Sequence, residues 1–247
     1  MNKSERERLK HNEAADALAS ASLFVASHGR TLALAAVAVV LVIGVVLGYN
    51  AWRARAEERA QTQLQAAIDT AGRPVAAPAA DGTPPPADAE TFASEAARTS
   101  AVIDELRAVS DAYPSTDAGV QALYYAASLM AEANRLEEAA SAYQSVIDRS
   151  GSSILGRMAR LGLASVQVRA KDFDTAISTF QSLSASGSEL PTDGVLMHLA
   201  DAYVQAGRPA DAIETLRRVV NEFPQSPYAS DARQRADALQ ADVPKAS

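Results

Sequence analysis

Apolar residues divide the chain into one long uncharged run and a series of shorter amphipathic segments. Residues 31–52 contain no charged side chain. A hydrocarbon core about 30 Å thick needs roughly 20 helical residues to cross it, and only a helix satisfies its own backbone polar groups there. From residue 90 onward, apolar residues recur at spacings of three and four, without alternating β-branched runs. The pattern predicts an all-α protein in which one N-terminal transmembrane helix precedes helical hairpins.

A buried core helix and a cleaved signal peptide compete with a membrane anchor for the uncharged run. A core helix rarely stays apolar over such a length. A signal peptide has an apolar core of roughly 7–15 residues and a short leader, whereas 30 residues precede this run. Tyr49 and Trp52 lie at its end, as interfacial residues do. We therefore interpret residues 31–52 as an uncleaved anchor.

The residues next to the anchor carry weaker signals. Residues 1–30 form a charged, then Ala/Ser-rich tail that is either a short interfacial helix or disordered. Gly44 and Gly48 form a GxxxG pair, which permits close helix–helix contact and possible homodimerisation. Glycine pairs also occur in membrane helices that do not associate, so the pair is only a candidate contact.

A juxtamembrane helix is predicted over 53–71, where Ala56, Ala60, Leu64 and Ile68 form a stripe at spacing four. Gly72 and Pro74 then end the helix. Residues 72–90 contain five prolines and little that could be buried. They predict an extended linker that separates the anchor helix from the folded part.

The remaining chain, 91–241, repeats itself at intervals of 36 and 37 residues. Its clearest unit has one helix face with Leu199 and Tyr203, a break at Gly207, and a second face with Leu216, followed by Pro224. Sequence matching predicts three full repeats, a leading second helix that lacks its first, and a polar capping helix. These segments are about 117–150, 153–187 and 193–224 for the repeats, 91–114 for the half repeat and 226–241 for the cap, before a tail at 242–247.

Charge and cysteine content narrow the function. The formal net charge is −7, and all of it falls in residues 90–247. This part lacks the basic surface that phosphate binding requires, so nucleic acid is not an expected partner. With no cysteine, the chain has no disulfide, thiolate metal site or cysteine nucleophile.

The repeats resemble the tetratricopeptide repeat, a 34-residue helix–turn–helix unit. The third copy carries most of the signature. The earlier copies depart from it, since Gln167 replaces the tyrosine, Lys171 replaces the turn glycine and no copy opens with tryptophan. The resemblance implies an α-solenoid of helix hairpins. The matching residues of the third copy are Leu196, Leu199, Ala200, Tyr203, Gly207, Ala212, Leu216, Val219 and Pro224.

The whole layout is similar to a narrower bacterial family, the membrane-anchored ancillary subunit of the SecYEG translocon. The similar segments include FVASHGRTLAL, YNAWRARAEE and RLGLASVQVRAKDFDTAISTF. The resemblance implies partners among translocon subunits, periplasmic chaperones and client polypeptides. It also implies a single pass through the inner membrane with periplasmic repeats. Cell-division coordinators and outer-membrane assembly proteins carry similar repeats, so an envelope adaptor without a translocon role is the alternative.

Charge does not support that orientation. Arg30 lies just before the span, whereas Arg53, Arg55 and Arg59 follow it, and the positive-inside rule therefore favours a cytoplasmic C-terminus. We follow the resemblance.

No catalytic, metal or cofactor motif is present, and we expect no enzyme. The three histidines are widely separated, and phosphate loops and nucleophile elbows are absent. Function is then expected on a groove lined by the first helices of the repeats. The candidate groove residues are Gln121, Tyr124, Ser128, Met158, Leu161, Ser165, Met197 and Asp201.

The residue types in this groove indicate its ligand. Tyr124, Leu161 and Met197 stand where related domains that bind C-terminal carboxylates carry Lys or Asn. An apolar peptide or helix is therefore the expected ligand. The alternative is that these three side chains only complete the core.

Overall fold

The computed structural model describes residues 3–76, 91–185 and 190–242, and it is helical nearly throughout these ranges. The described part agrees with the predicted all-α class. The helices are α1 (Lys3–Ala71), α2 (Glu95–Ala112), α3 (Asp117–Glu132), α4 (Leu136–Ser150), α5 (Ile154–Arg169), α6 (Phe173–Leu183), α7 (Thr192–Gln205), α8 (Pro209–Glu222) and α9 (Ala229–Asp242). The chain forms two compact units, Met1–Arg55 and Ala56–Ser247.

The first unit contains most of α1. Residues 3–30, for which a tail or a short helix was expected, belong to this helix, and the predicted tail at 242–247 lies almost entirely outside the described residues. Within Val37–Ala71, an 18-residue window has a mean hydropathy of 1.8 and none of it is buried. Leu41 and Leu47 are 64% and 63% exposed. The helix is therefore long and apolar enough to cross a membrane.

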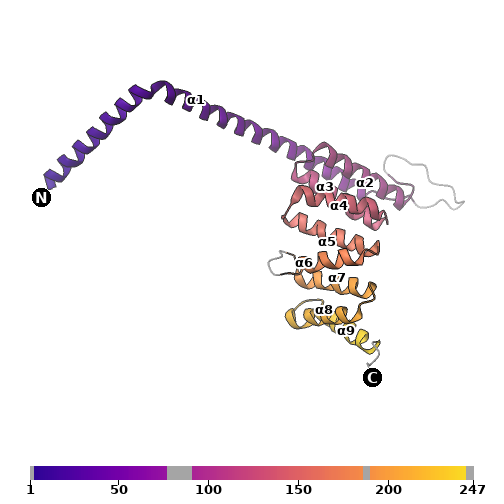
Figure 1. The fold of residues 1–247 in the computed structure, drawn as a ribbon. Helices are drawn as coiled ribbons and strands as arrows, with labels where there is room; N and C mark the ends of the chain where they lie inside the picture. Colours follow the sequence, from indigo (N-terminus) through magenta and orange to yellow (C-terminus); the bar gives the residue numbers. More distant parts are fainter. Residues whose placement is uncertain (1–2, 77–90, 186–189, 243–247) are drawn as a thin grey trace. The chain divides into compact units, whose positions relative to one another are not determined.

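In the second unit, α2 to α9 pack in chain order as stacked hairpins (Figure 1). Each of the later helices contacts the next one, and α3 also contacts α5, as α5 contacts α7. The first helices of neighbouring repeats therefore line one side of the stack. The predicted repeats correspond to the pairs α3–α4, α5–α6 and α7–α8, and the predicted cap corresponds to α9, which begins three residues later than expected.

The same type of turn joins the two helices in each of the three predicted repeats. Asn134, Lys171 and Gly207 have φ of 62°, 67° and 72°, so all three lie in the left-handed region. The next residue donates its backbone N–H to the carbonyl five residues earlier: Arg135 to Met130 at 2.8 Å, Asp172 to Gln167 at 2.9 Å and Arg208 to Tyr203 at 2.8 Å. This hydrogen bond caps the end of the first helix. Lys171 thus takes the conformation of the glycine it replaces.

Side-chain caps begin several of the other helices. Ser94, Thr116 and Ser153 each accept a hydrogen bond from the backbone N–H three residues later, and these bonds begin α2, α3 and α5. Pro209 opens α8 at a position where no backbone donor is needed.

Small residues fill the core where helices approach closely. Ala126, Ala164, Ala200 and Ala212 are fully buried. Two apolar clusters result, and α5 contributes to both, with Ala159 and Val166 in one and Ala164 and Val168 in the other.

The segment 56–71 departs from the prediction. It was expected to be a juxtamembrane helix separated from the repeats, and 91–114 was expected to lack its first helix. Instead, Ala60, Leu64 and Ala67 are buried in the same cluster as the apolar residues of α2. Ile68, part of the predicted stripe, is 43% exposed. The buried face follows helical spacings of four and three instead of four alone, because 3.6 residues make one turn.

Candidate protein-binding surfaces

The predicted groove residues lie on the first helices α3, α5 and α7, but they differ in exposure. Gln121 is exposed, while Tyr124 and Ser128 are half-buried. On α5, Met158 is 37% exposed, and Leu161 and Ser165 are half-buried.

Tyr124 is held by two aromatic neighbours. Its ring centroid lies 5.7 Å from that of Tyr143 and 6.0 Å from that of Tyr125, both edge to face. Burial, and then the neighbouring Tyr125, raise the pKa of Tyr124. Tyr125 itself is 40% exposed. The two tyrosines of α3 therefore form an aromatic surface, and Tyr143 of α4 packs against one of them.

The Tyr143 side chain extends from α4 toward α3 and α5. Burial raises its pKa, and a hydrogen bond with Ser128 opposes that rise. A Cβ added to Gly162 on α5 would lie 2.5 Å from the Tyr143 ring. Glycine at 162 is therefore required by this close approach, and Ser128 serves to hold Tyr143.

The two candidates on α7 already have partners within the fold. Met197 is 8% exposed, so it belongs to the core rather than to an accessible surface. Asp201 forms an ion pair with Arg235 of α9, which also lies 3.7 Å from Asp231. Of the two interpretations of the groove residues, completion of the core holds for Met197.

The apolar candidates that remain accessible therefore come from α3 and α5. Tyr124, Tyr125, Met158 and Leu161, on the contacting helices α3 and α5, are together named the tyrosine–methionine surface. Tyr125 is not among the groove residues predicted from the sequence. The sequence does contain a sign of this residue, because two tyrosines are adjacent on a helix whose buried face is formed by other apolar residues.

The Gly44–Gly48 pair lies in the exposed stretch of α1. A Cβ at either glycine would meet nothing within 4 Å. The predicted helix–helix contact stays a prediction.

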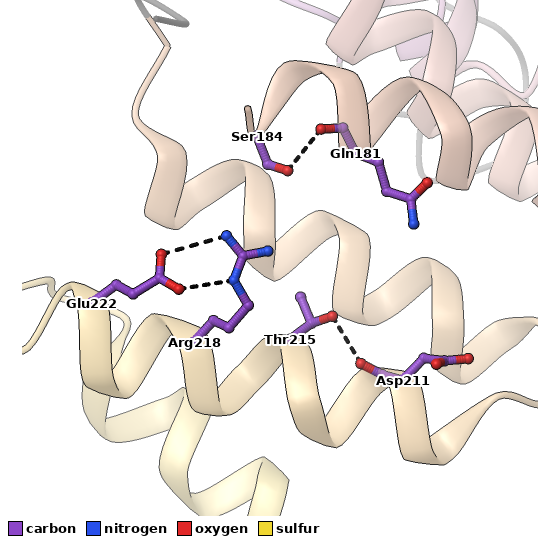
Figure 2. Close-up of polar contacts among 6 residues, drawn as sticks. All are labelled: Gln181, Ser184, Asp211, Thr215, Arg218 and Glu222. Atoms are coloured by element: carbon purple, nitrogen blue, oxygen red, sulfur yellow. Dashed lines mark hydrogen bonds and ion pairs between the residues drawn. The ribbon is translucent and has the colours of Figure 1, made fainter. Parts of the chain in front are cut away.

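A recess with a volume of 490 Å³, which was not predicted from the sequence, lies between the second helices α6 and α8. Figure 2 shows Gln181 and Ser184 on one wall and Thr215 and Arg218 on the other. Leu199 and Tyr203 of α7 also line the recess. A related recess of 370 Å³ lies between α2 and α4 and includes Met130, the counterpart of Tyr203.

Polar groups in the larger recess are largely paired with one another. Arg218 donates to both carboxylate oxygens of Glu222, at 2.9 and 3.4 Å, and Arg208 donates to Asp211 at 2.7 Å. Gln181 donates to the Tyr203 hydroxyl at 2.8 Å. The available signal was the recurrence of Arg-x-x-acid at the start of α4 and α8, since Arg135 pairs with Glu138 as Arg208 does with Asp211.

The pKa shifts of the paired arginines and glutamates do not favour acid–base chemistry. Hydrogen bonds to carboxylates raise the pKa of Arg135, Arg208 and Arg218, and hydrogen bonds from arginines lower the pKa of Glu138 and Glu222. Each shift moves the group away from neutrality, whereas a catalytic acid or base needs a pKa near the working pH. Across the described residues, no three His, Cys, Asp or Glu side chains are grouped to hold a metal ion.

Comparisons with known proteins agree with this architecture. A family model described as a tetratricopeptide repeat-like domain matches residues 23–190, more than half of the chain, and one described as a tetratricopeptide repeat matches 161–228. None of the curated proteins compared matches the chain.

Two solved structures of nearly identical TPR-like repeats from Podosopora anserina, assigned there to a putative kinesin light chain, are also similar. Both are 14% identical to this chain. One has a TM-score of 0.49 and covers 77% of this chain and 99% of its own. The other, a single-residue variant, has a TM-score of 0.51 and covers 75% and 93%. At this identity the likeness concerns the fold alone.

Proposed function

Because this chain belongs to the tetratricopeptide repeat-like domain family, and is therefore a protein-interaction scaffold, we propose that it works as a membrane-anchored scaffold at the Sec translocon of a bacterial inner membrane. Its partners are translocon subunits, export chaperones and emerging client polypeptides. The observation that carries the membrane-anchored scaffold is the combination, in one chain, of an apolar helix that is not buried and a repeat solenoid. In water an exposed apolar surface of this size is unfavourable, so the helix favours a membrane-anchored scaffold over a freely soluble one. The choice of the translocon rests on the resemblance of the chain to the translocon-associated family.

The tyrosine–methionine surface is the proposed contact for the partner. Tyr125 and Met158 are 40% and 37% exposed, and Tyr124 and Leu161, on the same two helices, are half-buried. Tyrosine and methionine are enriched in protein interfaces because their large side chains bury apolar area at a low or adaptable conformational cost. An apolar segment of a partner, extended or helical, fits this chemistry better than a C-terminal carboxylate does.

The repeats are proposed to lie on the periplasmic side. This rests on the resemblance of the chain to the translocon-associated family and runs against the arginine count near the span. Protease treatment of intact spheroplasts tests the orientation. Digestion of the repeats is expected, and their protection would place them in the cytoplasm.

Site-specific photocrosslinking in intact membranes tests the proposed function. A photoreactive residue at Met158 is expected to form adducts with translocon subunits or export chaperones. The matched control is Gln144, exposed on the second helix α4, where such adducts should be rare. If position 158 yields no translocon or export-chaperone adduct, the proposed function is wrong.

A further inference from the structure

The recess between α6 and α8 and the recess between α2 and α4 occupy equivalent places in the solenoid. A shift of 73 residues superimposes α4 on α8, and the buried Val146 then falls on the buried Val219. A shift of 74 residues superimposes α2 on α6, and the buried Ile103 falls on the buried Ile177. The side chains that line one recess can therefore be compared with those that line the other.

In the recess between α2 and α4, an arginine of the chain itself crosses from one wall to the other. Arg149, in the last turn of α4, donates from its Nη1 to the Ser110 Oγ of α2 at 2.8 Å. Ser110 is fully buried, and Arg149 lines the recess. The guanidinium lies near the C-terminal end of α2, where a positive charge is favourable. This recess is thus partly filled by a cation that the chain supplies.

The recess between α6 and α8 lacks this crossing. The counterpart of Ser110 is Ser184 at the end of α6, and the counterpart of Arg149 is Glu222. Ser184 is half-buried and donates to a carbonyl of its own helix, while Glu222 pairs with Arg218 of its own helix (Figure 2). Among the described residues, no hydrogen bond or ion pair joins α6 to α8. The recess therefore stays open, with 490 Å³ against 370 Å³.

The charge of the open recess favours a cation. Arg208 and Arg218 are each paired with a carboxylate, that of Asp211 and that of Glu222. Glu214 also lines the recess, and it has neither a hydrogen bond nor an ion pair with any described residue. These five side chains together carry one more negative charge than positive charge. Residues 90–247 as a whole carry −7, so a basic ligand is the complementary one.

Two buried polar side chains in the recess can bind a peptide main chain. Tyr203 and Thr215 are both 5% exposed and line the recess. The Tyr203 hydroxyl accepts from Gln181 at 2.8 Å, and its own hydrogen has no acceptor among the described residues. Thr215 donates to the Asp211 carbonyl at 2.8 Å and keeps its capacity to accept. A buried hydroxyl usually uses its hydrogen, and a peptide carbonyl is an acceptor of the required kind.

We propose that the recess between α6 and α8 binds an arginine side chain carried by a basic segment of another protein. The guanidinium of the partner takes the place that Arg149 has in the other recess, beside the Ser184 hydroxyl, and Glu214 supplies the free carboxylate. Arginine fits better than lysine because the chain itself uses a planar guanidinium at the equivalent place. The site lies on the second helices, away from the tyrosine–methionine surface, and it requires neither the membrane anchor nor the translocon.

Fluorescence anisotropy with the full-length protein in an uncharged detergent tests the ligand. The probe is a short labelled peptide of alternating arginine and serine, and its control has citrulline, which has a similar shape but no charge, in place of arginine. Saturable binding of the arginine peptide is expected, with the citrulline peptide weaker by about tenfold because the charge-assisted hydrogen bonds are lost.

Three results would overturn the proposed ligand. The first is equal affinity for the two peptides, and the second is no saturable binding of the arginine peptide up to about 1 mM. The third is displacement of the peptide by free arginine at the concentration at which the unlabelled peptide displaces it, because the ligand would then be the amino acid.

Glu222→Arg tests the place of binding. This substitution rebuilds the crossing of the other recess, since position 222 is the counterpart of Arg149, and the chain then fills the recess itself. Binding of the arginine peptide should weaken by about tenfold. Glu105→Arg is the control, because it makes the same change of charge at an exposed position of α2 that lines neither recess, and binding should stay within about twofold. Equal affinities of the two variants would show that the recess is not the site.

Circular dichroism shows whether the variants are folded. If Glu222→Arg does not fold, Ser184→Ala takes its place, because it removes only a half-buried hydroxyl. Binding should then weaken by about threefold, and an unchanged affinity counts against the inference. Photocrosslinking from Met158 in the Glu222→Arg variant keeps the two proposals apart, since adducts at the tyrosine–methionine surface should not change when the recess is filled.

Discussion

The first repeat, formed by residues 56–71 and α2, and the last, formed by α7 and α8, differ in how their two helices are joined. In the last repeat, α7 and α8 are joined by a tight turn in which Gly207 has φ of 72° and Arg208 donates to Tyr203. In the first, residues 56–71 and α2 are joined by the long insertion 72–94, in which Val75 and Phe92 form a parallel bridge. Both hairpins nevertheless bury alanine-rich faces, with Ala60 and Ala67 in one and Ala200 and Ala212 in the other.

This difference shows that two helices of the solenoid can pair as a hairpin without the tight turn. The packed faces and the caps determine the pairing, and the connection only has to allow it. Loop closure costs rise with the logarithm of loop length, so a long insertion is tolerated. Four variants would break or sharpen this comparison, and they are taken from the largest expected effect to the smallest.

Ala60→Glu would place a carboxylate in the core of the first repeat. Ala60 is fully buried among apolar residues, so an unpaired charge there should lower the free energy of unfolding by about 3–5 kcal/mol. Urea unfolding of the full chain in detergent, followed by circular dichroism, measures this change. Ala66→Glu introduces the same group by the same substitution at an exposed position of this helix and should change little. Equal midpoints for the two variants would show that 56–71 is not part of the repeat core.

Glu57→Ala would remove the carboxylate that caps α3. Two charge-assisted hydrogen bonds are lost, and the free energy of unfolding should fall by about 1–2 kcal/mol. Hydrogen exchange of the Asp117 and Ala118 amides should become faster in the same variant, because these are the donors to Glu57. Glu58→Ala is the control, since the Glu58 side chain is exposed and the described contact of that residue uses its backbone carbonyl. Unchanged exchange at 117 and 118 would contradict the capping role.

Lys171→Gly would relax the turn between α5 and α6. Lys171 has φ of 67°, a conformation that costs a residue with a Cβ about 1–2 kcal/mol. Part of that gain is offset by the greater freedom of glycine in the unfolded chain. The net effect expected is a stabilisation of about 0.5–1 kcal/mol, measured as a higher midpoint of urea unfolding. The reciprocal variant, Gly207→Ala, should destabilise the chain, and a shift of the same sign in both would contradict the shared turn geometry.

Lengthening the insertion should have the smallest effect. Between the bridge residues Val75 and Phe92 lie 16 residues, and sixteen added Gly/Ser residues double that loop at a cost of about 0.6 kcal/mol. The same addition after Gly207 would break the hydrogen bond from Arg208 to Tyr203 and should cost more. Thermal unfolding of both variants measures the difference. If the insertion proved as sensitive as the turn, the connection in the first repeat would have a structural role of its own.

The sequence predicted the later repeats well because their signals are local. Leu196, Leu199 and Leu216, singled out by spacing alone, are all buried, and the turn at Lys171 has the predicted place although the glycine is missing. The groove was predicted less well. Tyr124 and Met158 lie at partly accessible positions, while Met197 is buried. Spacing identifies the face on which a side chain lies but not how deeply a neighbouring helix covers it.

The recess between α6 and α8 could not be predicted in this way. Gln181 and Arg218 come from different repeats, and their positions around one recess depend on how the two second helices stack (Figure 2). Only the recurring Arg-x-x-acid pairs pointed to that side of the solenoid.

The sequence by itself determined the helical class, the length of the apolar run and the order of the repeats, because helix period and hydrophobicity are properties of neighbouring residues. Only the tertiary structure decided that 56–71 belongs to the first repeat. Its partners Val102 and Asp117 lie beyond the insertion, so no local spacing connects them. Burial depends on which distant helix covers a face, and the same amphipathic pattern is compatible with an exposed juxtamembrane helix or a packed one.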